Sequence, residues 1–138
     1  MANELKTNNA FGKNKETLEL VIDWTSSTGG ASTTSSADIG FIGNLSASDV
    51  INSRYLVKAQ TVPDATTAPT ANYDVVVNDE NGEDIFEGAL GDRSATAAET
   101  VFPVANDVPA VVPIIGDLSV AVTNAGDTKK GKVILTIE

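Results

Sequence analysis

Cysteine and histidine are both absent from the 138 residues of this chain. The lack of cysteine excludes disulfides and thiolate nucleophiles, and the lack of both residue types excludes zinc sites of the usual kind. Histidine is the side chain most often used as a general base, so that route to catalysis is missing too. The fold must therefore be stabilised by the packing of its core, with subunit association as a further source.

Long hydrophobic runs are also missing. No apolar segment approaches the roughly 20 residues that a membrane-spanning helix needs. The first 16 residues, MANELKTNNAFGKNKE, lack the apolar centre of a secretory signal. We therefore expect a chain that is made and used without export through a membrane, and that has no membrane partner.

Positive charge is scarce, with nine basic residues against nineteen acidic ones and a formal net charge of -10. Such a field repels the phosphate backbone, so nucleic acid is not expected as a partner. Hydrophobic residues make up 41% of the chain and charged residues 20%, which is typical of a globular protein. The length fits one domain with a core of its own.

Catalytic motifs are lacking as well. Neither the serine elbow G-x-S-x-G nor the phosphate-binding loop G-x-x-x-x-G-K-[ST] occurs in the sequence. A carboxylate pair for glycoside hydrolysis depends on spatial geometry and stays open, although aromatic residues, at 5%, are few for stacking on sugar rings. We expect a protein that is not an enzyme, with no catalytic residue, no metal and no cofactor.

What the sequence does contain is alternation of apolar and polar residues. In Glu16–Trp24, every second residue from Leu18 to Trp24 is apolar, which predicts a half-buried strand with Trp24 in the core. Further strands are expected at 37–43, 55–62 and 73–78, with a short helical turn at 46–52. Near the end, two alternating segments flank the polar loop 124–131 and predict a closing β-hairpin. Their apolar residues are Leu118, Val120 and Val122, then Val133, Leu135 and Ile137.

These segments recur at intervals of roughly 8–12 residues, and no long apolar stripe has helical spacing. The pattern predicts an all-β fold, either an antiparallel β-sandwich or a jelly-roll-like barrel, with at most short helical turns. Residues 16–138 are expected to form this single domain. Residues 1–15 are expected to be a flexible N-terminal arm, either frayed or ordered on a neighbouring subunit. Prolines 103, 109 and 113 predict an extended edge segment rather than a central strand.

The hairpin expected at 73–88 leaves its register open. A two-residue Asn-Gly turn sets Val77 opposite Phe86, whereas a three-residue loop ending in Gly82 sets Val77 opposite Ile85. We favour the longer loop, because the shorter one also places Asp79 opposite Asp84, and like charges in that position repel.

The acidic turn Asp79–Asp84 also has the oxygen-rich composition of a calcium loop. Aligning its glycine with that of the EF-hand pattern places Val77 at the first ligand position, where a carboxylate is required. A hairpin turn with its carboxylates in solvent is therefore the favoured interpretation.

Two stretches resemble small virion proteins of tailed bacteriophages. Tyr73–Ala95 reads YDVVVNDENGEDIFEGALGDRSA, and Pro113–Ile137 reads PIIGDLSVAVTNAGDTKKGKVILTI. The shared pattern is a strand, an acidic Asn-Gly turn, a Gly-Asp-Arg-Ser segment and a closing hairpin that carries Asn124-Ala125-Gly126. The resemblance covers about half of the chain, and its motifs are structural rather than catalytic.

This resemblance implies a β-sandwich that decorates or cements the phage head, with the lattice of the major capsid protein as partner. It also implies a homo-oligomer, with a trimer as the first expectation. The protein would be made in the cytoplasm of the bacterial host and located on the surface of the phage head. The alternative is a carbohydrate-binding or adhesin-like module of the tail or fibre. Such a module needs exposed aromatic side chains, for which Trp24, Tyr55 and Tyr73 are the Trp and Tyr candidates.

Overall fold

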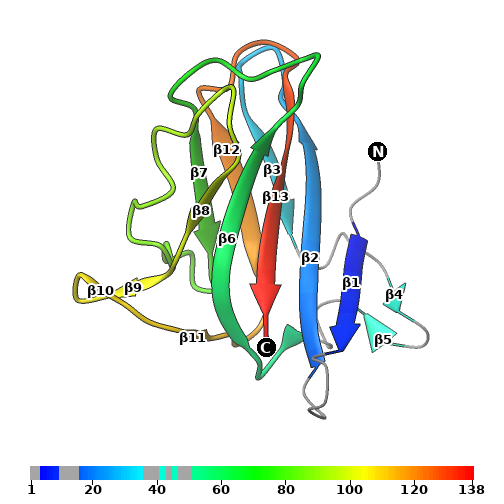
Figure 1. The fold of residues 1–138 in the computed structure, drawn as a ribbon, viewed down its shortest axis with the longest axis vertical. Helices are drawn as coiled ribbons and strands as arrows, with labels where there is room; N and C mark the ends of the chain where they lie inside the picture. Colours follow the sequence, from blue (N-terminus) through cyan, green and yellow to red (C-terminus); the bar gives the residue numbers. More distant parts are fainter. Residues whose placement is uncertain (1–3, 10–15, 36–40, 43–44, 47–50) are drawn as a thin grey trace.

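The computed structural model describes residues 4–9, 16–35, 41–42, 45–46 and 51–138, and this part is organised almost wholly as β-strands and turns (Figure 1). The longest strands are β2 (Glu16–Thr25), β6 (Tyr55–Pro63) and β13 (Lys130–Ile137). The others are β1 (Glu4–Asn9), β3 (Ser32–Ser35), β4 (Phe41–Ile42), β5 (Leu45–Ser46), β7 (Asp74–Asn78), β8 (Glu99–Val101), β9 (Val104–Ala105), β10 (Val108–Pro109), β11 (Val112–Pro113) and β12 (Ser119–Thr123).

The strands form two antiparallel sheets that face each other (Figure 1). The larger sheet has the order β1-β2-β13-β6, and the far edge of β6 pairs with both β8 and β11. The smaller sheet has the order β3-β12-β7, and two short hairpins, β4–β5 and β9–β10, lie outside both sheets. The fold is a β-sandwich, which confirms the all-β antiparallel class that the alternation predicts. The described strands form two sheets rather than a closed barrel.

The core lies between the two sheets and is built from alternate strand positions. In β13, Val133, Leu135 and Ile137 are buried, whereas the residues between them are half-buried. Each such side chain contributes roughly 1.5–3 kcal/mol on burial, so packing is the main source of stability in this chain without disulfides. The remaining hydrophobic members of the core are Leu18, Leu20, Ile22, Trp24, Ile51, Leu56, Ala59, Tyr73, Val75, Val77, Ile85, Phe86, Leu90, Ile114, Leu118, Val120, Val122 and Ala125.

Trp24 lies in this core, as its place on the apolar face of β2 predicts, and only 2% of it is exposed. Its ring packs against Tyr73, with the ring centroids 5.6 Å apart and the planes inclined by 47°. Gly131 of β13 is the residue directly opposite Trp24 in the sheet. A Cβ atom at position 131 would lie 2.5 Å from Cζ2 of Trp24. The indole therefore fills the space that a side chain at position 131 would need.

The hydroxyl of Tyr73 is buried near that of Thr61, and neither hydroxyl forms a hydrogen bond of good geometry. Burial raises the pKa of Tyr73 above its ordinary value of 10.0, and the Thr61 hydroxyl offsets part of this shift. As the pH rises past 10, the unfolded chain therefore loses this proton before the folded chain does. The free energy of unfolding must then fall with rising pH until the raised pKa of the folded state is passed.

We expect Tyr73→Phe to keep its stability near neutral pH, because the buried hydroxyl that it removes forms no hydrogen bond of good geometry. Above about pH 10 the variant should lose less stability than the parent, because it lacks the group that titrates. Urea unfolding near neutral pH and at about pH 11 measures both effects. Tyr55→Phe, at a half-exposed ring, is the control. An alkaline loss that is the same in Tyr73→Phe and the parent would contradict this prediction.

The predicted closing hairpin is wrong, although both of its strands exist. β12 pairs with β3 and β7 in the smaller sheet, whereas β13 pairs with β2 and β6 in the larger one. The loop between them crosses from one sheet to the other. Both strands direct their apolar faces into the same core from opposite sides, and alternation in the sequence cannot distinguish that arrangement from direct pairing.

The three-residue loop at 80–82 is confirmed. The amide of Ile85 donates to the carbonyl of Val77 at 2.9 Å, which sets these two residues opposite each other. Gly82 adopts a φ of 84°, the left-handed conformation that favours glycine at the end of such a loop.

The segment after this loop does not return as a full strand. It pairs through two isolated bridges, Asn78 with Asp84 and Tyr73 with Arg93, and forms a series of turns between them. The carboxylate of Asp84 accepts hydrogen bonds from the amides of Phe86 and Gly88, at 3.0 and 2.7 Å, which favours turns over a ladder. The turns direct Phe86 into the core, where it is fully buried.

Part of the expected N-terminal arm forms a strand. Residues Glu4–Asn9 make β1, which pairs with β2 in the register Glu4 to Val21 through Asn9 to Glu16. The rest of 1–15 lies outside the described residues. The strand expected at 37–43 is described only for Phe41–Ile42, and most of the helical turn expected at 46–52 lies outside the described residues as well.

Candidate protein-binding surface

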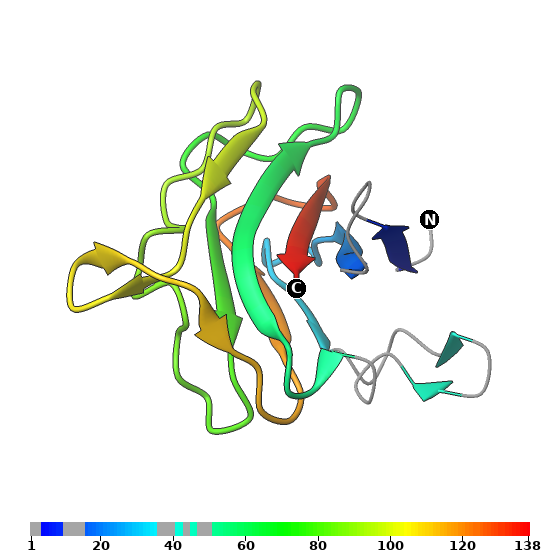
Figure 2. The same ribbon diagram turned by 60° about the horizontal axis from the view of Figure 1, so that its bottom comes forward.

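A hairpin projects from the body of the sandwich between β8 and β11. β9 and β10 pair with each other and with no other described strand, and Figures 1 and 2 show them standing away from both sheets. Asn106 and Asp107 at its tip have φ values of 51° and 63°, as a tight hairpin turn requires. Residues 102–111 are called the projecting hairpin from here on. As the three prolines predict, this stretch is an edge segment and not a central strand.

The edge of β6 is open where this hairpin leaves it. β11 pairs with Tyr55 and Leu56, and β8 pairs with β6 from Ala59 to Thr61. Val57 and Lys58 thus have no strand beside them on this edge within the described chain. On the other side, the pairing of β6 with β13 shifts register at Ile137, which leaves Val57 as an extra residue. A bulge of this kind turns the side chain toward the surface.

Among residues 17–31 and 51–138, for which side-chain exposure is described, five large hydrophobic side chains are at least half exposed, and they lie on or beside the projecting hairpin. They are Tyr55 (50%), Phe102 (50%), Val108 (62%), Val111 (56%) and Ile115 (65%), and they are called the apolar surface below. Residues of this type scattered singly over a protein need no explanation, whereas their concentration on one surface marks a binding site.

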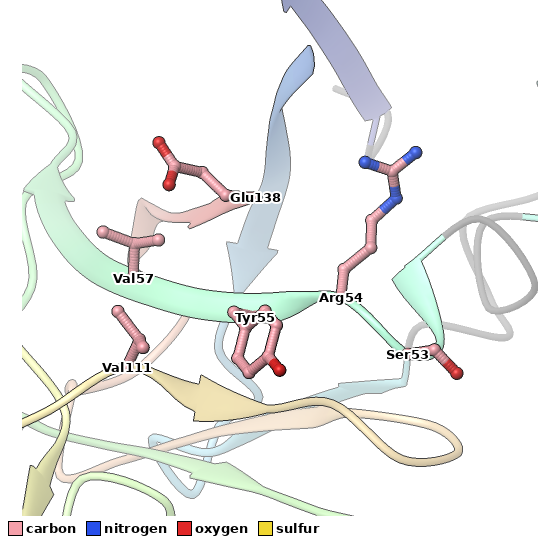
Figure 3. A pocket seen from close by; sticks show the side chains of 6 residues that line it. All are labelled: Ser53, Arg54, Tyr55, Val57, Val111 and Glu138. Atoms are coloured by element: carbon pink, nitrogen blue, oxygen red, sulfur yellow. The ribbon is translucent and has the colours of Figure 1, made fainter. Parts of the chain in front are cut away.

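Two adjoining hollows run along this surface. The first is lined by Ser53, Arg54, Tyr55, Val57, Val111 and Glu138, and Figure 3 shows the ring of Tyr55 beside β11 and Val111 extending toward β6. The second is lined by Val57, Phe102, Pro109, Ala110 and Val111. Because they share Val57 and Val111, the hollows form one apolar groove between β6 and the projecting hairpin. This groove can accommodate apolar side chains of a partner.

Acidic residues surround the apolar surface. Asp107 lies at the tip of the projecting hairpin, Asp117 follows Ile115, and Glu138 lines the groove. The side chain of Glu80 lies against Gly116. Residues 102–117 contain no lysine or arginine, and residues 74–92 contain seven carboxylates and no basic residue. The groove itself is lined by one basic and one acidic residue, Arg54 and Glu138, and the other acidic residues lie outside its lining.

The acidic turn Asp79–Asp84 uses its carboxylates locally. Asp79 Oδ1 accepts hydrogen bonds from the amides of Asn81 and Glu83, at 2.9 and 3.0 Å. Asp84 caps the following turn in the same way. Within the described residues, no three acidic side chains gather as they would to hold a metal ion. These contacts favour the interpretation of this segment as a hairpin turn.

Two other carboxylates tie loops together at the opposite end of the sandwich. Asp64 accepts hydrogen bonds from backbone amides, including that of Thr67 at 2.7 Å, and these bonds lower its pKa below 3.8. Asp74 accepts from the amide of Asp92 at 2.9 Å and from the side chain of Asn124 at 2.6 Å, which lowers its pKa in the same direction. These two carboxylates are therefore engaged within the chain.

The aromatic candidates for a sugar site are divided by the fold. Trp24 and Tyr73 are buried against each other, and Tyr55 is half exposed in the groove. Trp24 is therefore not accessible for stacking on a sugar ring. Phe102 lies among the apolar residues Val57, Pro109, Ala110 and Val111. Tyr55 shares its hollow with two valines and with Ser53, Arg54 and Glu138.

The sequence reasoning missed this surface. The prolines identify residues 101–113 as an edge segment, but nothing in the run VFPVANDVPAVVPII shows that Val108, Val111 and Ile115 are exposed to solvent. One feature of the sequence could have indicated the surface, namely an apolar run that contains three prolines. Because such a segment cannot join a central strand, some of its apolar side chains can lie outside the core.

The described part of the chain contains no helix that is long and apolar enough to cross a membrane. No family model and no curated protein matches the sequence.

Proposed function

We propose that this chain is a structural protein of a tailed-phage particle, most simply a decoration or cement protein on the lattice of the major capsid protein. The observation that carries the proposal is the concentration of the five largely exposed large hydrophobic side chains of residues 17–31 and 51–138 on or beside the projecting hairpin of a strongly acidic β-sandwich. The resemblance of residues 73–95 and 113–137 to small virion proteins is the reason for proposing that this surface binds within a phage particle.

The architecture suits such a role. Repeated weak contacts over a symmetric lattice gain strength through effective concentration, so each copy needs only a modest contact surface. The net charge of -10 favours solubility of the surface that faces solvent. A homo-oligomer, a trimer in the first instance, fits the symmetry axes that such a lattice offers.

Binding to capsids tests the proposal. Expanded capsids assembled without this chain, from the phage that encodes it, are mixed with the purified protein and sedimented. We expect saturable co-sedimentation with a fixed number of copies per lattice unit, and an image reconstruction that shows added density on the outer head surface. A protein that stays in the supernatant at all concentrations, or density on the tail, would overturn the assignment to the head.

A further inference from the structure

We infer that Asn81 and Gly82 form a self-modifying site, at which the Asn81 side chain is converted to aspartate and isoaspartate through a cyclic succinimide. Asn81 is the one asparagine of the sequence that is followed directly by glycine. The pair lies in the exposed loop 80–82, which sets the register of the hairpin after β7. The inference does not rest on the proposed function, because the reaction needs only the folded chain and water.

The reaction is an intramolecular attack by the main chain on the side chain. The backbone nitrogen of Gly82 gives up its proton to water and forms a bond to Cγ of Asn81. The bond from Cγ to Nδ2 breaks, and Nδ2 takes up a proton and leaves as ammonia. Water then opens the ring at Cγ, which gives aspartate, or at the backbone carbonyl carbon, which gives isoaspartate with one extra carbon atom in the main chain. Either product adds one negative charge.

The fold places glycine at position 82 and leaves space around it. Gly82 has a φ of 84°, a conformation that glycine adopts without strain. A Cβ atom there would have no heavy atom within 4 Å, apart from those of the residue itself and its two neighbours in the chain. The Asn81 side chain forms no hydrogen bond with another described residue, so it can turn toward the nitrogen. The loop geometry therefore selects the residue type that hinders the attack least.

The same loop contains the contacts that limit the rate. The amide of Gly82 donates to the carbonyl of Asp79 at 3.1 Å, and a nitrogen whose proton is held in this way is a poor nucleophile. Asp79 Oδ1 also accepts hydrogen bonds from the amides of Asn81 and Glu83, at 2.9 and 3.0 Å. The attack therefore requires local opening of the turn, which exposed loops undergo far more often than the core does. Asp79 is thus the positioning residue that sets the rate.

The other asparagines of residues 51–138 lack this combination. Asn52 Oδ1 accepts a hydrogen bond from the amide of Gly116 at 2.9 Å, and Asn124 Nδ2 donates to Asp74 at 2.6 Å. The remaining three are each followed by a residue with a large side chain, which hinders approach to the nitrogen; they are Asn72, Asn78 and Asn106. These positions serve as internal references for the reaction at Asn81.

Ageing of the purified protein under native conditions tests the site. Trypsin cleavage after Lys58 and Arg93 releases residues 59–93, and fragmentation of this peptide in a mass spectrometer locates each modified asparagine. We expect Asn81 to be converted at least about tenfold faster than Asn72 or Asn78. Asn81→Gln should abolish the reaction in the loop, because its longer side chain would have to close a larger ring. Asn78→Gln, the matched control, should leave the rate at Asn81 unchanged.

Asp79→Ala tests the limit that the turn imposes. We expect conversion at Asn81 to be at least about threefold faster than in the parent, because the turn opens more often without the two carboxylate bonds. In guanidinium chloride that unfolds both proteins, the two rates should become equal. Asp127→Ala, at another exposed turn, is the control and should behave as the parent does. Unfolding curves check that each variant is folded under the native conditions.

The outcomes decide each part of the inference. Conversion of Asn81 no faster than that of Asn72 and Asn78 would overturn the modification site. Equal native rates in Asp79→Ala and the parent would overturn the role of Asp79 in limiting the reaction. The readout is a covalent change in the isolated chain, so it is independent of whether the protein binds capsids.

Discussion

Phe86→Ala is expected to lower the free energy of unfolding by about 3–5 kcal/mol, a large part of the total for a domain of this size. Phe86 is fully buried in the core, although it lies in a series of turns and not in a strand. The turns are held by the Asp84 carboxylate, which accepts hydrogen bonds from two backbone amides, so we expect the segment to keep its conformation when the ring is removed. A cavity would therefore remain, which adds to the lost burial of the ring.

Phe102→Ala is the matched control, because it makes the same change at a ring that is half exposed. Its stability should fall by less than about 1 kcal/mol. Urea unfolding at equilibrium measures both variants, and near-ultraviolet circular dichroism checks the packing around Trp24. Equal losses in the two variants would show that the turn segment does not pack its ring into the core.

Gly131→Ala is expected to destabilise the protein by about 2–3 kcal/mol, although alanine is otherwise the smallest change available. The new methyl group would lie 2.5 Å from Cζ2 and 2.8 Å from Cε2 of Trp24, and 3.0 Å from the carbonyl oxygen of Val62. The indole is itself packed against Tyr73 and cannot move aside without displacing that ring. Either the β13 backbone shifts away from its neighbours, or the aromatic pair repacks.

Gly29→Ala serves as the control, because a Cβ atom at that position would make only an ordinary contact, 3.7 Å from the Ser27 hydroxyl. Its unfolding midpoint should stay close to that of the parent. The tryptophan fluorescence of Gly131→Ala should change as well, since the surroundings of the indole change. A stability of Gly131→Ala equal to that of Gly29→Ala would mean that the ring does not occupy the space above Gly131.

The individual strands could be predicted from the sequence because each carries its own pattern. Period-two alternation placed Leu18, Leu20 and Trp24 on one buried face, and the like-charge argument at Asp79 and Asp84 selected the correct hairpin register. Pairing between distant strands could not be predicted in the same way. Alternation reports which face of a strand is buried but carries no information on its neighbours, so β12 and β13 were joined as a hairpin when they belong to opposite sheets.

The candidate binding surface was predictable only in part. The prolines show that residues 101–113 cannot form a central strand, but the exposure of Val108, Val111 and Ile115 depends on where the chain leaves the edge of β6. That position is set by the separate pairing of β8 and β11 with β6, which are contacts between distant residues. Local sequence therefore identifies the segment and leaves the direction of its side chains undetermined.

The position of β13 between β2 and β6 has a consequence for biosynthesis. The chain emerges from the ribosome from its N-terminus, so β2 and β6 are made long before the strand that joins them. Until Lys130–Ile137 has appeared, both keep an unpaired edge that is open to wrong partners, including the same strands of other nascent chains. Synthesis of β13 is thus the step that commits the sandwich to its native arrangement, and nascent chains stalled before residue 130 should be protease-sensitive along both strands.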